Sequence, residues 1–355
     1  MPLPMHYATT RDGVRIAYMS LGDGPPLVFA SNIFGDLSAY LGGWPPATEV
    51  TNRLVNLGWR VIRYDVRGMG YSDRNVDDVE LAARVLDLEA VVAALRLDRS
   101  ALAGLDIGAA TAVTYAVANQ ANVSRLILLS PWSSGVKYFA IPALRAAFAA
   151  EEVSDRDPQL FVNMLGSVAT SFKDVELVRQ LTNGIQKATS PEGLADYNTA
   201  SRRIDITPLL TQVTAATLVI HEPAFPFGSF ELCQEVAVAI PGAEFLIVND
   251  HSIAGRIHDE TVAGIDRFLR AVTTTETPLR TQAKAAGDGS PAPNGLTARE
   301  LQILRQVAAG STNKEIASEC QLAVSTVERH LVNLYNKIGA RGRADAIIFA
   351  LRNRL

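Results

Sequence analysis

The sequence has few of the features that support a disulfide-stabilised, metal-binding or membrane-spanning protein. Only two cysteines, Cys233 and Cys320, occur in 355 residues, and their wide separation excludes a disulfide framework or a cysteine-rich metal site. No two histidines and a carboxylate have the spacing of metal ligands, so we expect no metal and no other cofactor. A run of about 18 apolar residues is lacking, as is a basic N-terminal stretch followed by an apolar one. We therefore expect a cytoplasmic protein without a membrane span or signal peptide.

Charged residues are also few, and they are unevenly distributed. They make up 20% of the chain, whereas 48% of the residues are hydrophobic, enough to bury a full core and too many for general disorder. Residues 1–280 carry 23 basic and 31 acidic side chains, while residues 295–355 carry nine basic and five acidic ones. This small positive excess favours an anionic partner for the C-terminal part alone.

One segment separates two parts of the chain that differ in pattern. Thr, Ala, Gly, Ser and Pro dominate residues 273–295, and hydrophobic periodicity disappears there. This composition is typical of a linker, although a long surface loop has the same appearance. The sequence thus predicts two domains, 1–272 and 296–355, joined by a linker at 273–295.

The first of these domains has the alternation of an α/β protein. Short apolar runs with flat polarity, as expected of strands buried on both faces, occur at 25–31, 59–65, 100–105, 125–130, 216–222 and 244–250. Helical patterns lie between most of them, which predicts a mostly parallel sheet. Residues from about 132 to 210 contain helical patterns and no clear strand, so we expect a helical insertion over one end of the sheet.

The C-terminal 60 residues have the pattern of a small all-α domain of four helices. Thr297 with Glu300 and Thr312 with Glu315 fit capping boxes, which mark two helix starts. A third helix has one apolar face, and its opposite face is polar and basic, suited to the major groove of DNA. The apolar face consists of Val327, Leu331, Leu334 and Ile338, and the polar face of Ser325, Arg329, Val332, Asn333 and Asn336, with Thr326 and Lys337 beside it.

This segment resembles the LuxR-type helix-turn-helix, through L-T-x-R-E, G-x-x-N-K-E-I-A, S-T-V-x-x-H-L and K-I-G-A in order. The resemblance implies double-stranded DNA as partner, a third helix that reads the major groove, and a homodimer on inverted half-sites. Ala323 and Glu328 depart from the family pattern, so we expect an altered site preference. A protein-binding four-helix module is the alternative. The residues that the resemblance and the polar face assign to DNA contact are Lys314, Ser325, Thr326, Arg329, Asn333 and Lys337.

A strand-to-helix junction in the first domain has the form of a nucleophile elbow. Residues 104–108, Gly-Leu-Asp-Ile-Gly, match G-x-S-x-G with Asp106 in place of the serine. The glycines permit the tight turn, and we expect Asp106 to be exposed above the sheet, where the helix dipole favours a carboxylate.

The first domain as a whole resembles the α/β-hydrolase fold with a helical cap. The resemblance is carried by R-G-M-G-Y-S at 67–72, by the start of the domain (residues 12–29) and by its end (residues 239–269), which contains His251. It implies that His251 is the triad histidine and that Ser31, Asn32 and Ile33 border the pocket. The usual acid position holds Phe225, and the alternative position in P-W-S-S-G offers no acid. A histidine without its orienting acid is a weak base, since loss of that role costs about 10⁴ in rate in serine triads.

Two families related by fold use an aspartate nucleophile, and neither matches well. Ile33 and Ile107 stand where haloalkane dehalogenases hold the halide with Asn and Trp. Tyr138 and Tyr197 are candidates for the tyrosines of epoxide hydrolases, without a local motif to mark them. The backbone amides of Ile33 and Ile107 could still form an oxyanion pocket.

The sequence therefore predicts a DNA-binding transcription regulator whose hydrolase-like domain senses a small, largely apolar molecule without catalysis. The alternative is an active hydrolase of esters, halides or epoxides with Asp106 as nucleophile and His251 as base, which also binds DNA. A third interpretation, a protein-docking platform, predicts a sealed pocket. The expected ligand contacts are Ser31, Asn32, Ile33, Asp106, Ile107, Phe225 and His251.

Overall fold

The computed structural model divides the chain into two compact units, Met1–Thr273 and Thr274–Leu355, which we describe separately. The predicted linker lies outside the described residues. No helix in the described part of the chain has the length and hydropathy that a membrane crossing needs. The structure describes residues 4–30, 36–42, 45–149, 158–169, 175–223, 225, 227–248, 259–271, 296, 298–308, 311–320, 327, 331, 334–335, 337, 346–347 and 349–350.

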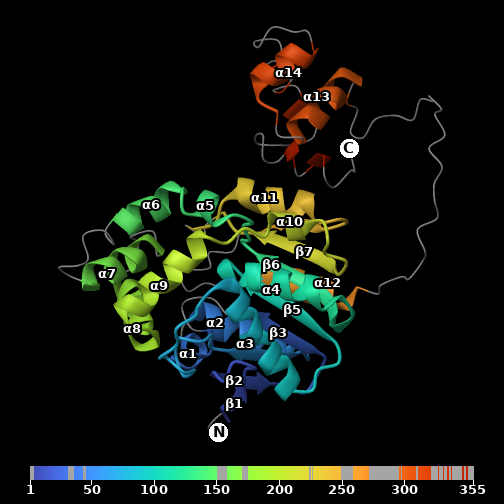
Figure 1. The fold of residues 1–355 in the computed structure, drawn as a ribbon. Coiled ribbons are helices and arrows are strands. Elements are labelled where there is room, and N and C mark those ends of the chain that lie inside the picture. The colour runs from blue at the N-terminus through green and yellow to red at the C-terminus, as the bar shows by residue number, and fades with distance from the viewer. Residues whose placement is uncertain are drawn as a thin grey trace. The chain divides into compact units, whose positions relative to one another are not determined.

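The first unit is built on an eight-stranded sheet in the order β1-β2-β4-β3-β5-β6-β7-β8 (Figure 1). The pairs β1–β2 and β2–β4 are antiparallel, and the remaining pairs are parallel. The predicted mostly parallel α/β fold is therefore confirmed. The strands are β1 (His6–Thr9), β2 (Arg15–Leu21), β3 (Pro26–Ala30), β4 (Arg60–Tyr64), β5 (Ser100–Leu105), β6 (Val123–Leu129), β7 (Ala216–His221) and β8 (Glu244–Ile247).

Helices cover both faces of the sheet, which is why the strands are apolar on both sides. In β3, Val28 belongs to the core on the side of α3 (Leu81–Ala94) and α4 (Ile107–Ala118), while Leu27 and Phe29 belong to the opposite core. That second core also contains α2 (Pro45–Asn56) and α12 (Asp259–Arg270). Such two-sided burial accounts for the flat polarity of the predicted strands. Two short helices, α1 (Asp36–Leu41) and a 3₁₀ turn at Gln120–Asn122, complete this part.

Between β6 and β7 the described residues form helices and no strand. Figure 1 shows α6 to α9 grouped to one side of the sheet. We call α5 to α9 the cap. Helix α10 precedes β7 in the chain, and α11 follows it. Their bounds are α5 (Gly135–Tyr138), α6 (Pro142–Ala149), α7 (Pro158–Ala169), α8 (Val175–Ala188), α9 (Pro191–Arg202), α10 (Thr207–Leu210) and α11 (Phe230–Ala239).

The two connections between the cap and the sheet run side by side. The Gly135 amide donates to the Ile204 carbonyl and the Ile206 amide to the Ser133 carbonyl, both at 2.8 Å. A Cβ atom at Gly135 would lie 2.2 Å from the Ser201 carbonyl oxygen, so the close approach requires glycine here. The cap is thereby fastened at one narrow junction.

The second unit contains α13 (Ala298–Ala308), α14 (Asn313–Cys320) and further helical residues up to Ala350. The predicted capping box at the start of α14 is present, since the Thr312 amide donates to Glu315 at 2.6 Å and the Glu315 amide to Thr312 Oγ1 at 3.3 Å. The predicted apolar face is buried at Val327, Leu331 and Leu334. Ile338 lies outside the described residues, as do Thr297 and the side chain of Lys314.

Candidate functional site

Asp106 occupies a strained turn between β5 and α4. Its φ of 53° and ψ of −120° fall in a region that residues with a side chain rarely adopt, at a cost of about 1–3 kcal/mol. Gly104 permits the turn, because a Cβ atom there would lie 2.5 Å from the Gly108 carbonyl oxygen. The predicted elbow is thus present, and such strain persists only where the surrounding fold enforces it.

The Asp106 carboxylate is held by two aromatic donors. Trp132 Nε1 donates to Oδ1 at 2.5 Å, and the Tyr138 hydroxyl donates to Oδ2 at 2.8 Å. The two rings are stacked, with centroids 4.7 Å apart and planes 15° from parallel. The expectation that Asp106 is exposed is wrong. Asp106 is 5% exposed, because the segment after β6 and the first turn of the cap fold over it.

The electrostatics of the elbow follow from this burial. Loss of solvation raises the pKa of Asp106 to about 6, while hydrogen bonds from Trp132, Tyr138 and the Ile107 amide act in the opposite direction. Burial and the neighbouring carboxylate raise the pKa of Tyr138 well above its ordinary value. Near neutral pH the pair is therefore a carboxylate and a protonated phenol. The role of the Ile107 amide as an oxyanion donor stays a prediction.

A small cavity of about 20 Å³ lies between the elbow and the cap. A volume of this size accommodates a water molecule and excludes an organic ligand. Binding such a ligand therefore requires lining side chains to move. Among the described residues, the lining consists of the polar residues Asp106, Tyr138, Asn198 and Ser201 and the apolar residues Ile107, Phe139, Leu144, Phe148, Leu165 and Phe227.

The structure brings some of the predicted pocket residues together and leaves others out. Asp106 and Ile107 line the cavity, and Phe225 packs against the lining residue Phe227 with ring centroids 5.7 Å apart. Ser31, Asn32, Ile33 and His251 lie outside the described residues. Sequence reasoning missed Trp132 altogether, although it lies in the P-W-S-S-G segment that was considered for an acid.

The other candidate side chains of the first unit have packing roles. Tyr197, a candidate for an epoxide-binding tyrosine, does not line the cavity; its ring lies 3.8 Å from the guanidinium carbon of the buried Arg84. His221 at the end of β7 packs against Phe230, and burial lowers its pKa. Within the described residues, no group of three metal-ligating side chains is placed to hold an ion.

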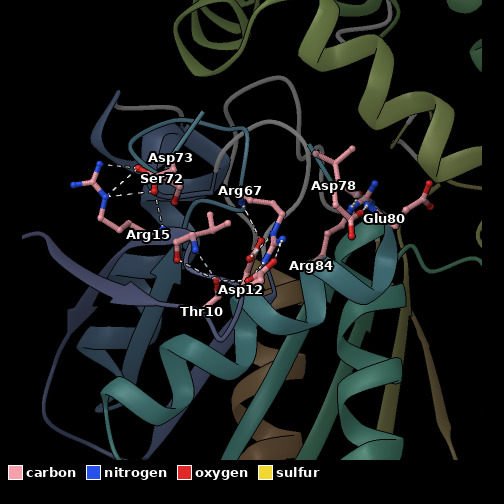
Figure 2. Close-up of polar contacts among 12 residues, drawn as sticks. Thr10, Asp12, Arg15, Arg67, Ser72, Asp73, Asp78, Glu80 and Arg84 are labelled. Atoms are coloured by element: carbon pink, nitrogen blue, oxygen red, sulfur yellow. Dashed lines mark hydrogen bonds and ion pairs between the residues drawn. The ribbon is translucent and has the colours of Figure 1, made fainter. Parts of the chain in front are cut away.

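The R-G-M-G-Y-S loop is held by a network of ion pairs, which Figure 2 shows around Arg67 and Arg15. Arg67 Nε lies 2.8 Å from Asp87 Oδ1, and its Nη1 lies 2.6 Å from Asp12 Oδ2. The hydrogen bond from Arg67 lowers the pKa of Asp12 to about 2. Arg67 and Asp87 are buried, whereas the pair of Arg15 and Asp73 lies at the surface.

This loop positions the cap. The Gly70 amide donates to the Ala188 carbonyl at the end of α8 at 2.7 Å, and the Thr189 hydroxyl donates to the Gly68 carbonyl at 3.3 Å. Gly70 has a φ of 52°, and a Cβ atom there would lie 2.0 Å from Asp65 Oδ2. The hydrolase-like loop therefore supports the end of the cap near Ala188, which is distant in sequence from the junction at Gly135.

Lys337 is the one predicted DNA-contact residue whose side chain the structure describes. Its Nζ lies 2.7 Å from Glu300 Oε2, and the side chains are 36% and 5% exposed respectively. The pair connects the third helical segment to α13. Lys314 lies on α14, but its side chain is outside the described residues, as are Ser325, Thr326, Arg329 and Asn333.

The sheet order, the elbow after β5 and the helical insertion after β6 define an α/β-hydrolase domain, and a family model described as alpha/beta hydrolase fold matches residues 25–171. A model described as bacterial regulatory proteins, luxR family, matches residues 294–350. The chain therefore joins an α/β-hydrolase domain to a LuxR-type DNA-binding regulatory domain.

Each domain resembles known proteins. The AB hydrolase superfamily protein YisY of Bacillus subtilis is 25% identical over 252 residues, which cover 68% of this chain and 89% of YisY. The transcriptional regulatory protein LiaR of the same species is 39% identical over 70 residues, which cover 20% of this chain and 33% of LiaR. An esterase structure from Exiguobacterium antarcticum has a TM-score of 0.64 at 20% identity and covers 75% of this chain and 99% of the esterase.

The buried carboxylate at the elbow makes stability depend on pH. The folded pKa of Asp106, about 6, lies above the ordinary value of 3.8 for an aspartate, so the folded state binds the proton more tightly. Asp106 therefore destabilises the fold at neutral pH, and this cost is relieved as the pH falls through 6. Lowering the pH from about 7.5 to about 5 should stabilise the wild type relative to Asp106→Asn by about 1 kcal/mol.

Urea unfolding of both proteins at the two pH values measures this difference directly. Other titrating groups are common to both proteins and cancel in the comparison. A pH-independent difference, or one of opposite sign, would show that burial does not control this carboxylate.

Proposed function

We propose that the protein is a one-component transcription regulator whose α/β-hydrolase domain binds a small, largely apolar molecule and thereby controls the DNA-binding domain. The observation that carries the proposal is the pairing of both Asp106 oxygens with Trp132 and Tyr138 beneath an apolar cap. A nucleophilic carboxylate must direct an electron-rich oxygen at the substrate, and the hydrogen bonds that both oxygens accept from the fold weaken Asp106 as a nucleophile. Asp106 acts as an anchor for the base of the cap.

The cap supplies the two states that such control requires. A ligand shifts an equilibrium only if it binds the two states with different free energies. The cavity is too small for an organic molecule, so a ligand between the sheet and the cap favours a displaced cap. The hinge at residues 133–135 and 204–206 gives the displacement a pivot. The DNA-binding domains pair as a homodimer, and the ligand changes how they pair.

The DNA-binding part of the proposal assigns base contacts to Arg329 and Asn333 and backbone contacts to Lys314, Ser325 and Thr326. A polar, basic helix face suits base edges and phosphates. Arg329→Ala in the full-length protein should reduce discrimination between a preferred duplex and others by about 1–3 kcal/mol. The preferred duplex would be selected from a random pool, and binding measured by fluorescence anisotropy across a salt series.

The matched control is Arg305→Ala, which removes the same charge from an exposed position on α13. It should leave the preference between duplexes unchanged. If both variants lost the same affinity for every duplex, Arg329 would not read bases. A wild-type protein without salt-sensitive binding to any duplex would refute the regulator itself.

A further inference from the structure

The buried Asp106 carboxylate borders the cavity. An ionised carboxylate accepts about four hydrogen bonds. Among the described residues, Trp132 and Tyr138 each donate one, one to each oxygen. Asp106 is 5% exposed and lines the cavity, so a donor placed in the cavity would lie beside a carboxylate that is shielded from bulk solvent. A bound molecule that offers such a donor would add a hydrogen bond to the carboxylate.

The described part of the cavity lining carries charge of one sign. Asp106 is its single acidic side chain, and no Lys, Arg or His belongs to the lining among the described residues. The guanidinium of Arg202 lies over Phe139 and Phe148, 4.4 and 5.1 Å from their ring centroids, but Arg202 is exposed and does not line the cavity. A second anion in the cavity would be repelled by the Asp106 carboxylate in a region of low dielectric constant.

The aromatic lining favours a cation for a second reason. Tyr138, Phe139, Phe148 and Phe227 border the same small space as the carboxylate. The faces of aromatic rings attract cations by about 0.5–2 kcal/mol, more when water is excluded. An ammonium group would combine this attraction with a charge-assisted hydrogen bond to Asp106, which is among the stronger polar contacts in proteins.

We propose that the cavity binds a primary organic amine, with the ammonium group on Asp106 and an apolar, ring-bearing remainder against the phenylalanines, and that it rejects carboxylates. This proposal rests on the proposed function and gives the sensed molecule a chemical class. The ammonium group is about the size of the water molecule that the cavity accommodates. The rest of the amine displaces the side chains of α6 and α7, so that binding and cap displacement are one event.

Three probes of similar size and different charge test the proposal: benzylamine, benzyl alcohol and benzoate. Thermal shift and calorimetry with the full-length protein near neutral pH should show concentration-dependent binding of benzylamine, weaker binding of the alcohol and none of benzoate. Asp106→Asn should weaken benzylamine binding at least tenfold. Asp196→Asn, which makes the same substitution at an exposed position of the cap helix α9, should leave the affinity unchanged.

A second measurement uses the wild type alone, so it does not depend on correct folding of the Asp106 variant. Benzylamine affinity should fall as the pH is lowered from about 7.5 to about 5, because Asp106 takes up a proton while the amine stays charged. Among the described residues, the other titratable side chains beside Asp106 are Tyr138 on α5 and Cys233 on α11, and burial raises the pKa of both, so each stays protonated in this range.

The proposal fails if benzylamine, phenethylamine and hexylamine all leave the protein unaffected, or if benzoate binds as well as benzylamine. It also fails if Asp106→Asn and low pH do not change the affinity. Duplex binding of the same preparation is measured in parallel. Salt-sensitive DNA binding without any effect of the amines would refute the amine-binding proposal alone. A lack of DNA binding would refute the proposed function as a regulator.

Discussion

Replacing Arg67 by methionine should lower the free energy of unfolding of the hydrolase domain by about 3–5 kcal/mol. The Arg67 and Asp87 side chains are 1% and 0% exposed, and the Nε–Oδ1 distance between them is 2.8 Å. The substitution would leave the Asp87 carboxylate buried without its cationic partner, and burial already raises the pKa of Asp87. Urea unfolding would report the loss as a lower midpoint with a similar slope.

The chain provides two controls for this experiment. Arg15→Met breaks the exposed pair with Asp73, which Figure 2 shows near the same loop, and it should change the midpoint far less. The double variant Arg67→Met with Asp87→Leu replaces the buried pair by apolar side chains and should recover most of the stability. If the double variant were as unstable as the single one, the loss would arise from packing or from Asp12 and not from an unpaired charge.

The same network explains why a hydrolase-like sequence motif persists at a site with an atypical elbow. Arg67 fixes the loop whose Gly70 amide binds the end of α8. The motif therefore positions the cap, and both a ligand-binding protein and an enzyme need a positioned cap. Its presence in the sequence predicts the fold and gives no information about catalysis.

The sheet and the elbow could be predicted because their signals are local. The run at 100–105 coincides with β5, and the glycines at 104 and 108 predict the sharp turn into α4. The run at 244–250 extends beyond β8, which ends at Ile247. Strand ends are set by where the hydrogen-bonded ladder stops, and apolar residues commonly continue past that point.

The clamp on Asp106 could not be predicted, because its members come from distant positions without a spacing rule. Trp132 and Tyr138 lie 26 and 32 residues further along the chain, after another helix and strand. Sequence reasoning considered P-W-S-S-G only for an acid and Tyr138 only for an epoxide. A hydrogen-bond donor to a carboxylate can come from any element, so only the fold reveals the pair.

The pair formed by Lys337 and Glu300 was missed for a similar reason, since 37 residues separate them. The sequence analysis assigned Glu300 to a capping box and Lys337 to DNA contact. Lys337→Met should therefore loosen the packing of α13 against the third helical segment, at a cost of about 1–3 kcal/mol for a charged hydrogen bond. DNA affinity should fall for every duplex, since the third segment carries the proposed contacts.

Glu300→Gln distinguishes the two roles of Lys337, because it weakens the pair and keeps the lysine. If the pair is structural, both variants should increase amide hydrogen exchange in α13 and α14 and weaken DNA binding. If Lys337 only contacts a phosphate, Lys337→Met should lower the salt slope by about one without faster exchange, and Glu300→Gln should leave DNA binding unchanged or improve it. Because Glu300 is 5% exposed and Lys337 is 36% exposed, the pair is shielded on one side, and we expect the structural outcome.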